Sequence, residues 1–149
     1  LDGDVAQMTI HTHPRWMSVC NIAAPRTGLE CKFSYRMVAA MAMAGISTAA
    51  IDSYTDAAAA DPALATLRDK VSVAEDPTLT EMQARVDVIY ADGRTAQLYH
   101  DLGASLDLAT RADRLTQKAR AVVGRALADD LWAAVQSDHV DDLTALLSY

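Results

Sequence analysis

Residues 25–45 read P-R-T-G-L-E-C-K-F-S-Y-R-M-V-A-A-M-A-M-A-G, and the rest of the chain is organised around this stretch. A polar turn at residues 25–28 leads into what we expect to be one unbroken helical run. Every residue from 37 to 44 is apolar, which predicts a helix covered on all sides. Gly45 should end this helix, because glycine reaches the left-handed conformation of a helix C-terminus at the lowest cost.

The first turn of this helix is polar, in contrast to the turns that follow. Lys32, Ser34, Tyr35 and Arg36 lie at the positive end of the helix dipole, where anions are favoured. Residues 1–48 hold four bases against three acids, whereas residues 49–149 hold nine bases against seventeen acids. Arg26, Lys32 and Arg36 therefore form the basic corner of an acidic chain. The alternative is a core helix with a solvated first turn, whose bases balance Glu30 and the acidic helices.

Length and composition limit the class of protein. A chain of 149 residues suits a single domain with a real core, and 51% apolar with 22% charged residues excludes a disordered chain. The net charge of -7 argues against nucleic acid or an anionic membrane surface as a partner. The isolated Cys20 and Cys31 are typical of a reduced compartment, and no run approaches the roughly 20 residues of a membrane span. We expect a cytoplasmic protein, and the first residue, Leu1, suggests a piece of a longer chain.

The N-terminal residues carry a strand pattern. Ala6, Met8 and Ile10 alternate with polar neighbours, which predicts a half-buried strand. His11 and His13 follow on its polar face. Such a pair can ligate zinc, but no further ligand is evident, so we interpret both as solvated histidines and predict no metal. Residues 14–24 are expected to form a loop and a short apolar strand, with Trp16 as a packing anchor.

A hairpin is predicted at residues 82–102. A two-residue Asp92-Gly93 turn would place Leu98 beside Asp87. A three-residue loop at 91–93, with Gly93 in a left-handed bulge, instead pairs Val88 with Ala96 and Val86 with Leu98. The second register keeps one face of the hairpin apolar and is preferred.

The remaining segments are predicted to be mainly helical. An alanine-rich helix is expected at 47–60, and a second begins at Asp61-Pro62 with aspartate as its N-cap and Leu64, Leu67 and Val71 on one face. Residues 71–73 are a strand candidate. Thr110 should start a further helix that Gly124 stops, followed by helices marked by Leu127, Leu131 and Val135, and by Leu143, Leu146 and Leu147 after an acidic turn at 138–142. The expected fold class is α+β, a two-layer sandwich with a mostly antiparallel sheet packed against helices.

No motif in the sequence names a reaction: there is no Gly-rich phosphate loop, no G-x-S-x-G and no H-E-x-x-H. However, the run P-x-T-G-L-E-x-K-F-S at residues 25–34, with the small-residue helix after it, resembles the C-terminal domain of the 2-methylcitrate dehydratase family (MmgE/PrpD). This family also includes cis-aconitate decarboxylase and iminodisuccinate epimerase. Later features fit in order, namely Asp61-Pro62, V-S-V at Val71, the V-x-V-x-x-A-D-G hairpin at 86–93 and a helix carrying Lys118.

The resemblance implies a lid over an active site. In such enzymes an all-helical N-terminal domain carries most catalytic residues, and an α+β domain closes over a small di- or tricarboxylate. We expect Arg26, Lys32, Ser34, Tyr35 and Arg36 to line the face that meets this substrate, because three bases fall within eleven residues of an otherwise acidic chain and coincide with the motif. The N-terminal helical domain of the same protein and a second copy of the chain are the expected partners. No cofactor is implied. The family commonly has a site-facing tyrosine three positions after the motif serine, where this chain has Met37.

Two classes of function therefore remain. The first is the lid of a lyase or isomerase that removes a proton next to a carboxylate and ends in water loss, decarboxylation or epimerisation; this chain alone is then expected to be inactive. The second is a non-catalytic interaction or dimerisation domain. A lid exposes a basic concave corner and needs a partner domain, whereas a pairing module should form a stable symmetric dimer on its own.

Overall fold

The computed structural model describes residues 3–137 and 140–147, and the chain forms two compact units. Unit 1 comprises Leu1–Thr48 and Asp52–Ala104, and unit 2 comprises Ala49–Ile51 and Ser105–Tyr149. The predicted single domain would span both units and stays a prediction. The acidic turn predicted at 138–142 lies partly outside the described residues.

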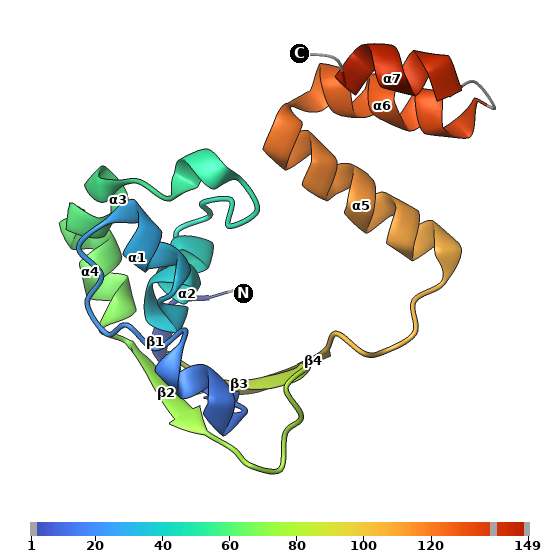
Figure 1. Cartoon of the computed structure of the whole chain (residues 1–149). Helices are drawn as coiled ribbons and strands as arrows, with labels where there is room; N and C mark the ends of the chain where they lie inside the picture. Colours follow the sequence, from blue (N-terminus) through green and yellow to red (C-terminus); the bar gives the residue numbers. More distant parts are fainter. Residues whose placement is uncertain (1–2, 138–139, 148–149) are drawn as a thin grey trace. The chain divides into compact units, whose positions relative to one another are not determined.

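Unit 1 contains the sheet and the first helices of the chain (Figure 1). Its elements in order are β1 (Val5–Thr12), η1 (Pro14–Ser18), α1 (Gly28–Lys32), α2 (Tyr35–Met43), η2 (Ile51–Ser53, shared at its first residue with unit 2), α3 (Asp56–Ala60), α4 (Pro62–Arg68), β2 (Val71–Glu75), β3 (Gln83–Tyr90) and β4 (Thr95–Asp101). Unit 2 contains α5 (Leu108–Val123), α6 (Arg125–Gln136) and α7 (Val140–Leu147). Within the described residues, no helix is both long enough and apolar enough to cross a bilayer.

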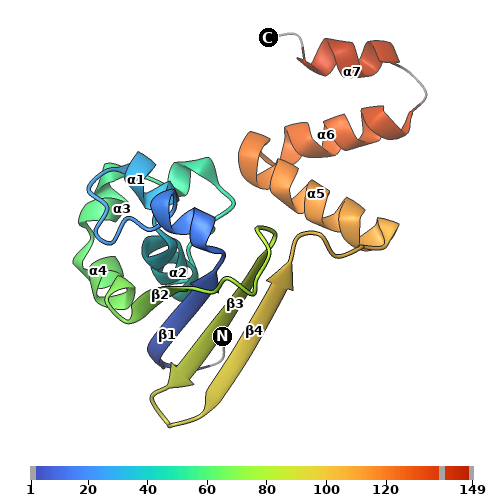
Figure 2. The same ribbon diagram turned by 60° about the horizontal axis from the view of Figure 1, so that its bottom comes forward.

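The described strands form one four-stranded sheet in the order β2-β1-β3-β4. β1 pairs with β2 in parallel and with β3 in antiparallel, and β3 pairs with β4 in antiparallel. The helices of unit 1 lie on one side of this sheet (Figures 1 and 2). The predicted α+β class with a mostly antiparallel sheet is confirmed.

β1 alternates as predicted, with one correction. Met8 and Ile10 are buried, and Thr12 at the end of the same inward row is only 2% exposed. Ala6 was expected inward but is exposed, and Val5 is buried in its place. The cause is a shift of register between Val5 and Gln7 against β3, because a bulge of one residue exchanges the faces of a strand.

α2 is the central helix of unit 1. Its residues Tyr35, Ala39 and Met43 pack against the sheet core. On another face, Met37, Ala40 and Met41 form a second core cluster with residues of α1, α3 and α4. This two-sided packing explains the apolar run, although Ala42 is exposed, so the prediction of a helix covered on all sides is wrong.

The predicted unbroken helical run is also wrong, because it is divided into α1 and α2. Phe33 leaves the helical conformation and Ser34 is extended, with φ −123° and ψ 101°. The end of the run is as expected. Gly45 has φ +73°, and Ile46 N donates to the Met41 carbonyl at 2.9 Å, which is the Schellman arrangement.

His11 and His13 each have a hydrogen-bonding partner within unit 1. His11 Nε2 lies 2.8 Å from Asp87 Oδ2 on the side of the sheet away from α2, and His13 Nδ1 accepts a hydrogen bond from Arg15 N at the start of η1. Trp16 lies in η1 rather than in the expected loop, and its Nε1 donates to the Glu81 carbonyl oxygen at 3.0 Å.

The helical segments after α2 need several corrections. The expected helix at 47–60 is reduced to η2 and the short α3, which Thr55 caps. Asp61 caps α4 as predicted, with Oδ1 accepting from Ala63 N at 2.8 Å, but Val71 belongs to β2. α5 begins at Leu108, and its N-cap is Asp107 rather than Thr110.

Unit 2 is a set of helices in which α5 packs against α6 and α6 against α7. Gly124, with φ +85°, ends α5 as predicted. Leu127 and Leu131 are half-buried, but the buried residues of α6 are Ala128 and Ala134. Val135 was predicted to be on the apolar face and is 61% exposed.

The hairpin has the preferred register. Val86 pairs with Leu98 and Val88 with Ala96, and Gly93 has φ +85° in the loop of residues 91–93. Gly93 N donates to the Tyr90 carbonyl, and Tyr90 N donates to the Arg94 carbonyl. The three-residue loop with a left-handed glycine is confirmed.

Replacing Gly93 by alanine should lower the free energy of unfolding by about 1 kcal/mol, because a Cβ is penalised at positive φ. A Cβ at this position would meet nothing within 4 Å, so the loss of stability would come from the backbone conformation alone. Urea unfolding followed by Trp16 fluorescence, in a Trp132→Phe background, measures it in unit 1. An unchanged midpoint would contradict the conformational argument.

Several aspartates of unit 1 should make its free energy of unfolding depend on pH in the acidic range. The Gln83 amide and the Gly103 N–H hold the pKa of Asp101 below its ordinary value, and the Gln97 amide does the same for Asp87. A carboxylate with a lowered pKa stabilises the folded state above the unfolded pKa, and this stabilisation is lost as the pH falls through the folded value. The urea midpoint should therefore fall between pH 6 and pH 3, and Asp101→Asn should weaken this dependence. A variant with the parent's full pH dependence would contradict the assignment.

Candidate functional site

α1 is built on a reciprocal capping arrangement. Thr27 Oγ1 accepts from Glu30 N at 3.2 Å, and Glu30 Oε2 accepts from Arg26 N at 2.6 Å. The T-x-x-E spacing at residues 27–30 is that of a capping box, except that Glu30 accepts from Arg26 N, one residue before the N-cap, rather than from Thr27 N. The Glu30 carboxylate is thus tied to backbone, and the side chain of Arg26 is exposed.

Gly28 allows two parts of unit 1 to meet. Its N–H donates to Asp56 Oδ1 at 2.8 Å. A Cβ built on Gly28 would lie inside van der Waals contact of the Tyr54 carbonyl and 2.9 Å from Thr55 Cα. Only glycine therefore fits where the residues before α3 cross the start of α1.

Ser34 is a structural residue of the motif. It is fully buried, its Oγ donates to the Ile22 carbonyl at 2.6 Å, and the same oxygen accepts from Met37 N at 3.2 Å as the N-cap of α2. A backbone bridge between Asn21 and Ser34 fastens the preceding loop at this point. The hydroxyl of Ser34 therefore faces protein rather than solvent, and its contribution to a site is to position its neighbours.

The three bases of the motif segment have no carboxylate partner among the residues that the structure describes. Lys32 Nζ lies over the Tyr54 ring, 5.5 Å from its centre, and Arg36 Nη1 donates to the neutral Asn21 Oδ1 at 2.6 Å. Among the described residues of unit 1, every other lysine and arginine is in an ion pair: Arg15 with Glu81, Arg68 with Asp69, Lys70 with Asp4, Arg85 with Asp76, and Arg94 with Asp92. Arg26, Lys32 and Arg36 thus differ from the other cations of unit 1.

The backbone at the helix starts is largely occupied by internal partners. Tyr35 N donates to the Cys20 carbonyl and Met37 N to Ser34 Oγ, so two of the first three N–H groups of α2 are bonded. At α1, Gly28 N already binds the Asp56 carboxylate. Lys32 lies in the last turn of α1, so the prediction that it lies at the positive end of a helix dipole is wrong. Any anion preference in this segment therefore depends on the basic side chains.

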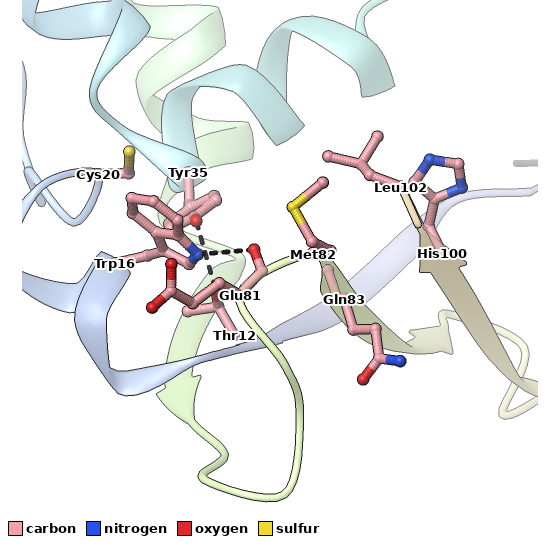
Figure 3. Close-up of a pocket in the computed structure, with 10 residues that line it drawn as sticks. Thr12, Trp16, Cys20, Tyr35, Glu81, Met82, Gln83, His100 and Leu102 are labelled. Atoms are coloured by element: carbon pink, nitrogen blue, oxygen red, sulfur yellow. Dashed lines mark hydrogen bonds between the residues drawn. The ribbon is translucent and has the colours of Figure 1, made fainter. Parts of the chain in front are cut away.

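Tyr35 lies on a separate cavity of about 420 Å³ (Figure 3). Its hydroxyl is 3.3 Å from Thr12 Oγ1, and burial raises the pKa of this phenol. The cavity is formed by residues of β1, η1, α2, β3 and β4 and the segments beside them: Thr12, Trp16, Cys20, Tyr35, Glu81, Met82, Gln83, Ala84, His100 and Leu102. Of the predicted site residues it includes only Tyr35.

The cavity is suited to an apolar group more than to a carboxylate. The Glu81 carboxylate on its wall is held by Arg15 Nη1, at 3.0 and 2.9 Å from its two oxygens. Trp16, Met82 and Leu102 supply much of the remaining surface. An anionic ligand would meet Glu81 there, whereas Arg26, Lys32 and Arg36 are absent from its walls.

Two residues that organise the site were not predicted. Asn21 binds Arg36 and pairs with Ser34, but a lone asparagine in a loop gives no signal of either. Thr12 could have been found, because it continues the inward alternation of Met8 and Ile10 and is a polar residue at a core position. Met37, at the place of the family's site-facing tyrosine, is fully buried in the helical core cluster.

The fold and this segment define an α+β domain whose motif requires Gly28, is capped by Thr27 and Ser34, and carries three cations without carboxylate partners in the described part of the chain. The family described as MmgE/PrpD C-terminal domain matches residues 3–140, so the chain belongs to this family. No curated protein matches the chain.

Proposed function

We propose that this domain caps the active site of a lyase or isomerase that acts on small di- or tricarboxylates. In this proposal Arg26, Lys32 and Arg36 bind carboxylate groups, and Ser34 and Tyr35 hold the start of α2 in place. An N-terminal helical domain of the same protein supplies the acid and base. The reaction then begins with removal of a proton next to a carboxylate.

The observation that carries the proposal is the set of cations without carboxylate partners. Five other described bases of unit 1 are neutralised by aspartate or glutamate, so the three on the motif segment keep their charge available. Arginine binds a carboxylate through its planar fork, and a charge-assisted hydrogen bond contributes about 1.5 to 3 kcal/mol. Family membership adds support, since this segment carries the motif that resembles the family.

The test compares variants of the chain fused to its native N-terminal domain. Lys32→Met and Arg26→Met should each lower kcat/KM for the active substrate, from among 2-methylcitrate, cis-aconitate and iminodisuccinate, at least tenfold, or about 1.4 kcal/mol. Lys70→Met is the matched control, because Lys70 is a base of the same unit paired with Asp4 at 3.1 Å.

The carboxylate assignment is wrong if both motif variants keep the parent's kcat/KM within about twofold, a loss under roughly 0.4 kcal/mol. This result would favour the non-catalytic interaction domain. A similar loss in Lys70→Met would mean that net charge, rather than position, determines the effect.

A further inference from the structure

Asn21 holds the guanidinium group of Arg36 from the loop before α1. Its Oδ1 accepts a hydrogen bond from Arg36 Nη1 at 2.6 Å, and both residues are half-buried. The guanidinium carries its N–H donors in a planar fork, and this contact uses one of its nitrogens. The other two nitrogens, Nε and Nη2, have no partner among the residues that the structure describes. One edge of the fork is therefore left for a ligand, and its geometry matches the two oxygens of a carboxylate.

The backbone on either side of this asparagine is fastened to the junction of α1 and α2. The Cys20 carbonyl accepts from Tyr35 N at 2.9 Å. On the other side, Ile22 N donates to the Phe33 carbonyl at 3.2 Å, and the Ile22 carbonyl accepts from Ser34 Oγ at 2.6 Å. These hydrogen bonds fix the asparagine beside the first turn of α2, to which the arginine belongs. An arginine that is already held loses less conformational entropy on binding a ligand than a free one does.

The partner of Arg36 is neutral, which distinguishes it from the other arginines of unit 1 that are held by a described residue. Each of these contacts an aspartate or a glutamate: Arg15, Arg68, Arg85 and Arg94. An aspartate at position 21 could accept the same hydrogen bond, but it would also cancel the charge of the arginine. Asparagine has nearly the shape of aspartate without its charge, so it orients the guanidinium and leaves the positive charge for another anion.

We propose that Asn21 is a positioning residue for carboxylate binding: it orients Arg36 towards one carboxylate group of the substrate and keeps the charge of this arginine available. The inference rests on the proposed function and extends it to a residue outside the motif segment. An ion pair between position 21 and Arg36 would weaken substrate binding without disturbing the fold. An asparagine that only fastened its loop would tolerate aspartate, which keeps the hydrogen bond.

The experiment uses the chain fused to its native N-terminal domain and the substrate on which the parent is active. Asn21→Asp should raise KM at least tenfold and leave kcat within about twofold, because the lost contact is common to the ground and transition states. Ala24→Asp is the matched control, since it adds the same charge at an exposed position of the same loop. It should leave KM within about twofold of the parent's. The urea midpoint of Asn21→Asp should be no lower than the parent's, because the hydrogen bond is kept and becomes an ion pair.

A double-mutant cycle ties the effect to Arg36. Arg36→Met alone should also raise KM. Asn21→Asp added to Arg36→Met should change KM by less than about twofold further, because the cation that the aspartate neutralises is gone. A merely structural role of the asparagine would not produce this dependence on Arg36.

The possible failures can be told apart. If Asn21→Asp keeps the parent's KM while Lys32→Met and Arg26→Met lower kcat/KM, the positioning role is overturned and the proposed function stands. If all three variants keep the parent's kinetics, the proposed function fails and the inference fails with it. The positioning role is also overturned if Ala24→Asp raises KM as much as Asn21→Asp does, or if Asn21→Asp keeps its full effect in the Arg36→Met background. In both cases the added charge would act on the substrate directly.

Discussion

Replacing Gly28 by alanine should lower the free energy of unfolding of unit 1 by about 3 kcal/mol, the upper part of the range for overpacking a dense interior. The added Cβ would meet the Tyr54 carbonyl and Thr55 Cα, which are backbone atoms and cannot turn aside as a flexible side chain can. Relief requires α1 to move from the segment before α3, which also lengthens the hydrogen bond from Gly28 N to Asp56. Urea unfolding followed by Trp16 fluorescence in a Trp132→Phe background measures the loss.

Gly93→Ala is the control for this substitution, since its Cβ meets nothing and its penalty is conformational. A loss at Gly28 no larger than that at Gly93 would show that the crossing adjusts easily. In that case the glycine of the motif would need another explanation.

Ser34→Ala should destabilise unit 1 by about 2 to 3 kcal/mol. The substitution removes an N-cap, which contributes about 1 kcal/mol, and leaves the Ile22 carbonyl and the Met37 N–H without the oxygen that serves both. Because Ser34 is fully buried, water cannot replace the lost hydroxyl without entering the core. The same unfolding measurement gives the value.

Thr55→Ala offers a matched comparison, because Thr55 caps α3 through Ala58 N at 3.0 Å but is exposed. It should lose about 1 kcal/mol or less. Equal losses at the two positions would mean that the buried hydrogen bond to Ile22 adds nothing beyond the cap.

The sheet and hairpin could be predicted because their signals are local and periodic. Alternation along β1 and the apolar face shared by Val86, Val88, Ala96 and Leu98 each select one arrangement. The bulge near Ala6 could not be predicted, because it depends on pairing with β3, which lies far along the chain. The prediction of one helix at 47–60 missed the break before α3. Alanine favours a helix, but the packing of Gly28 against residues 54 and 55 requires an extended chain there.

The candidate site was only partly accessible from the sequence. The cluster of bases near Lys32 follows from counting charges, but the absence of carboxylate partners follows from the folded structure. The break between α1 and α2 is the second feature of the site that could not be predicted from the sequence. By propensity, serine can lie within a helix or cap its start. The hydrogen bond from Ser34 to the Ile22 carbonyl favours the capping position.

The order of strands in the sheet also constrains how unit 1 assembles. β1 lies between β2 and β3, and Met8 pairs with Val71 and Val88, so the segment that holds α1 to α4 separates β1 from both of its partner strands along the chain. Loop closure over such separations costs entropy before any contact offsets it, which makes nonlocal sheets slow to form. The β3–β4 hairpin is the local exception, and a chain in which it forms first would present two open edges until β1 arrives.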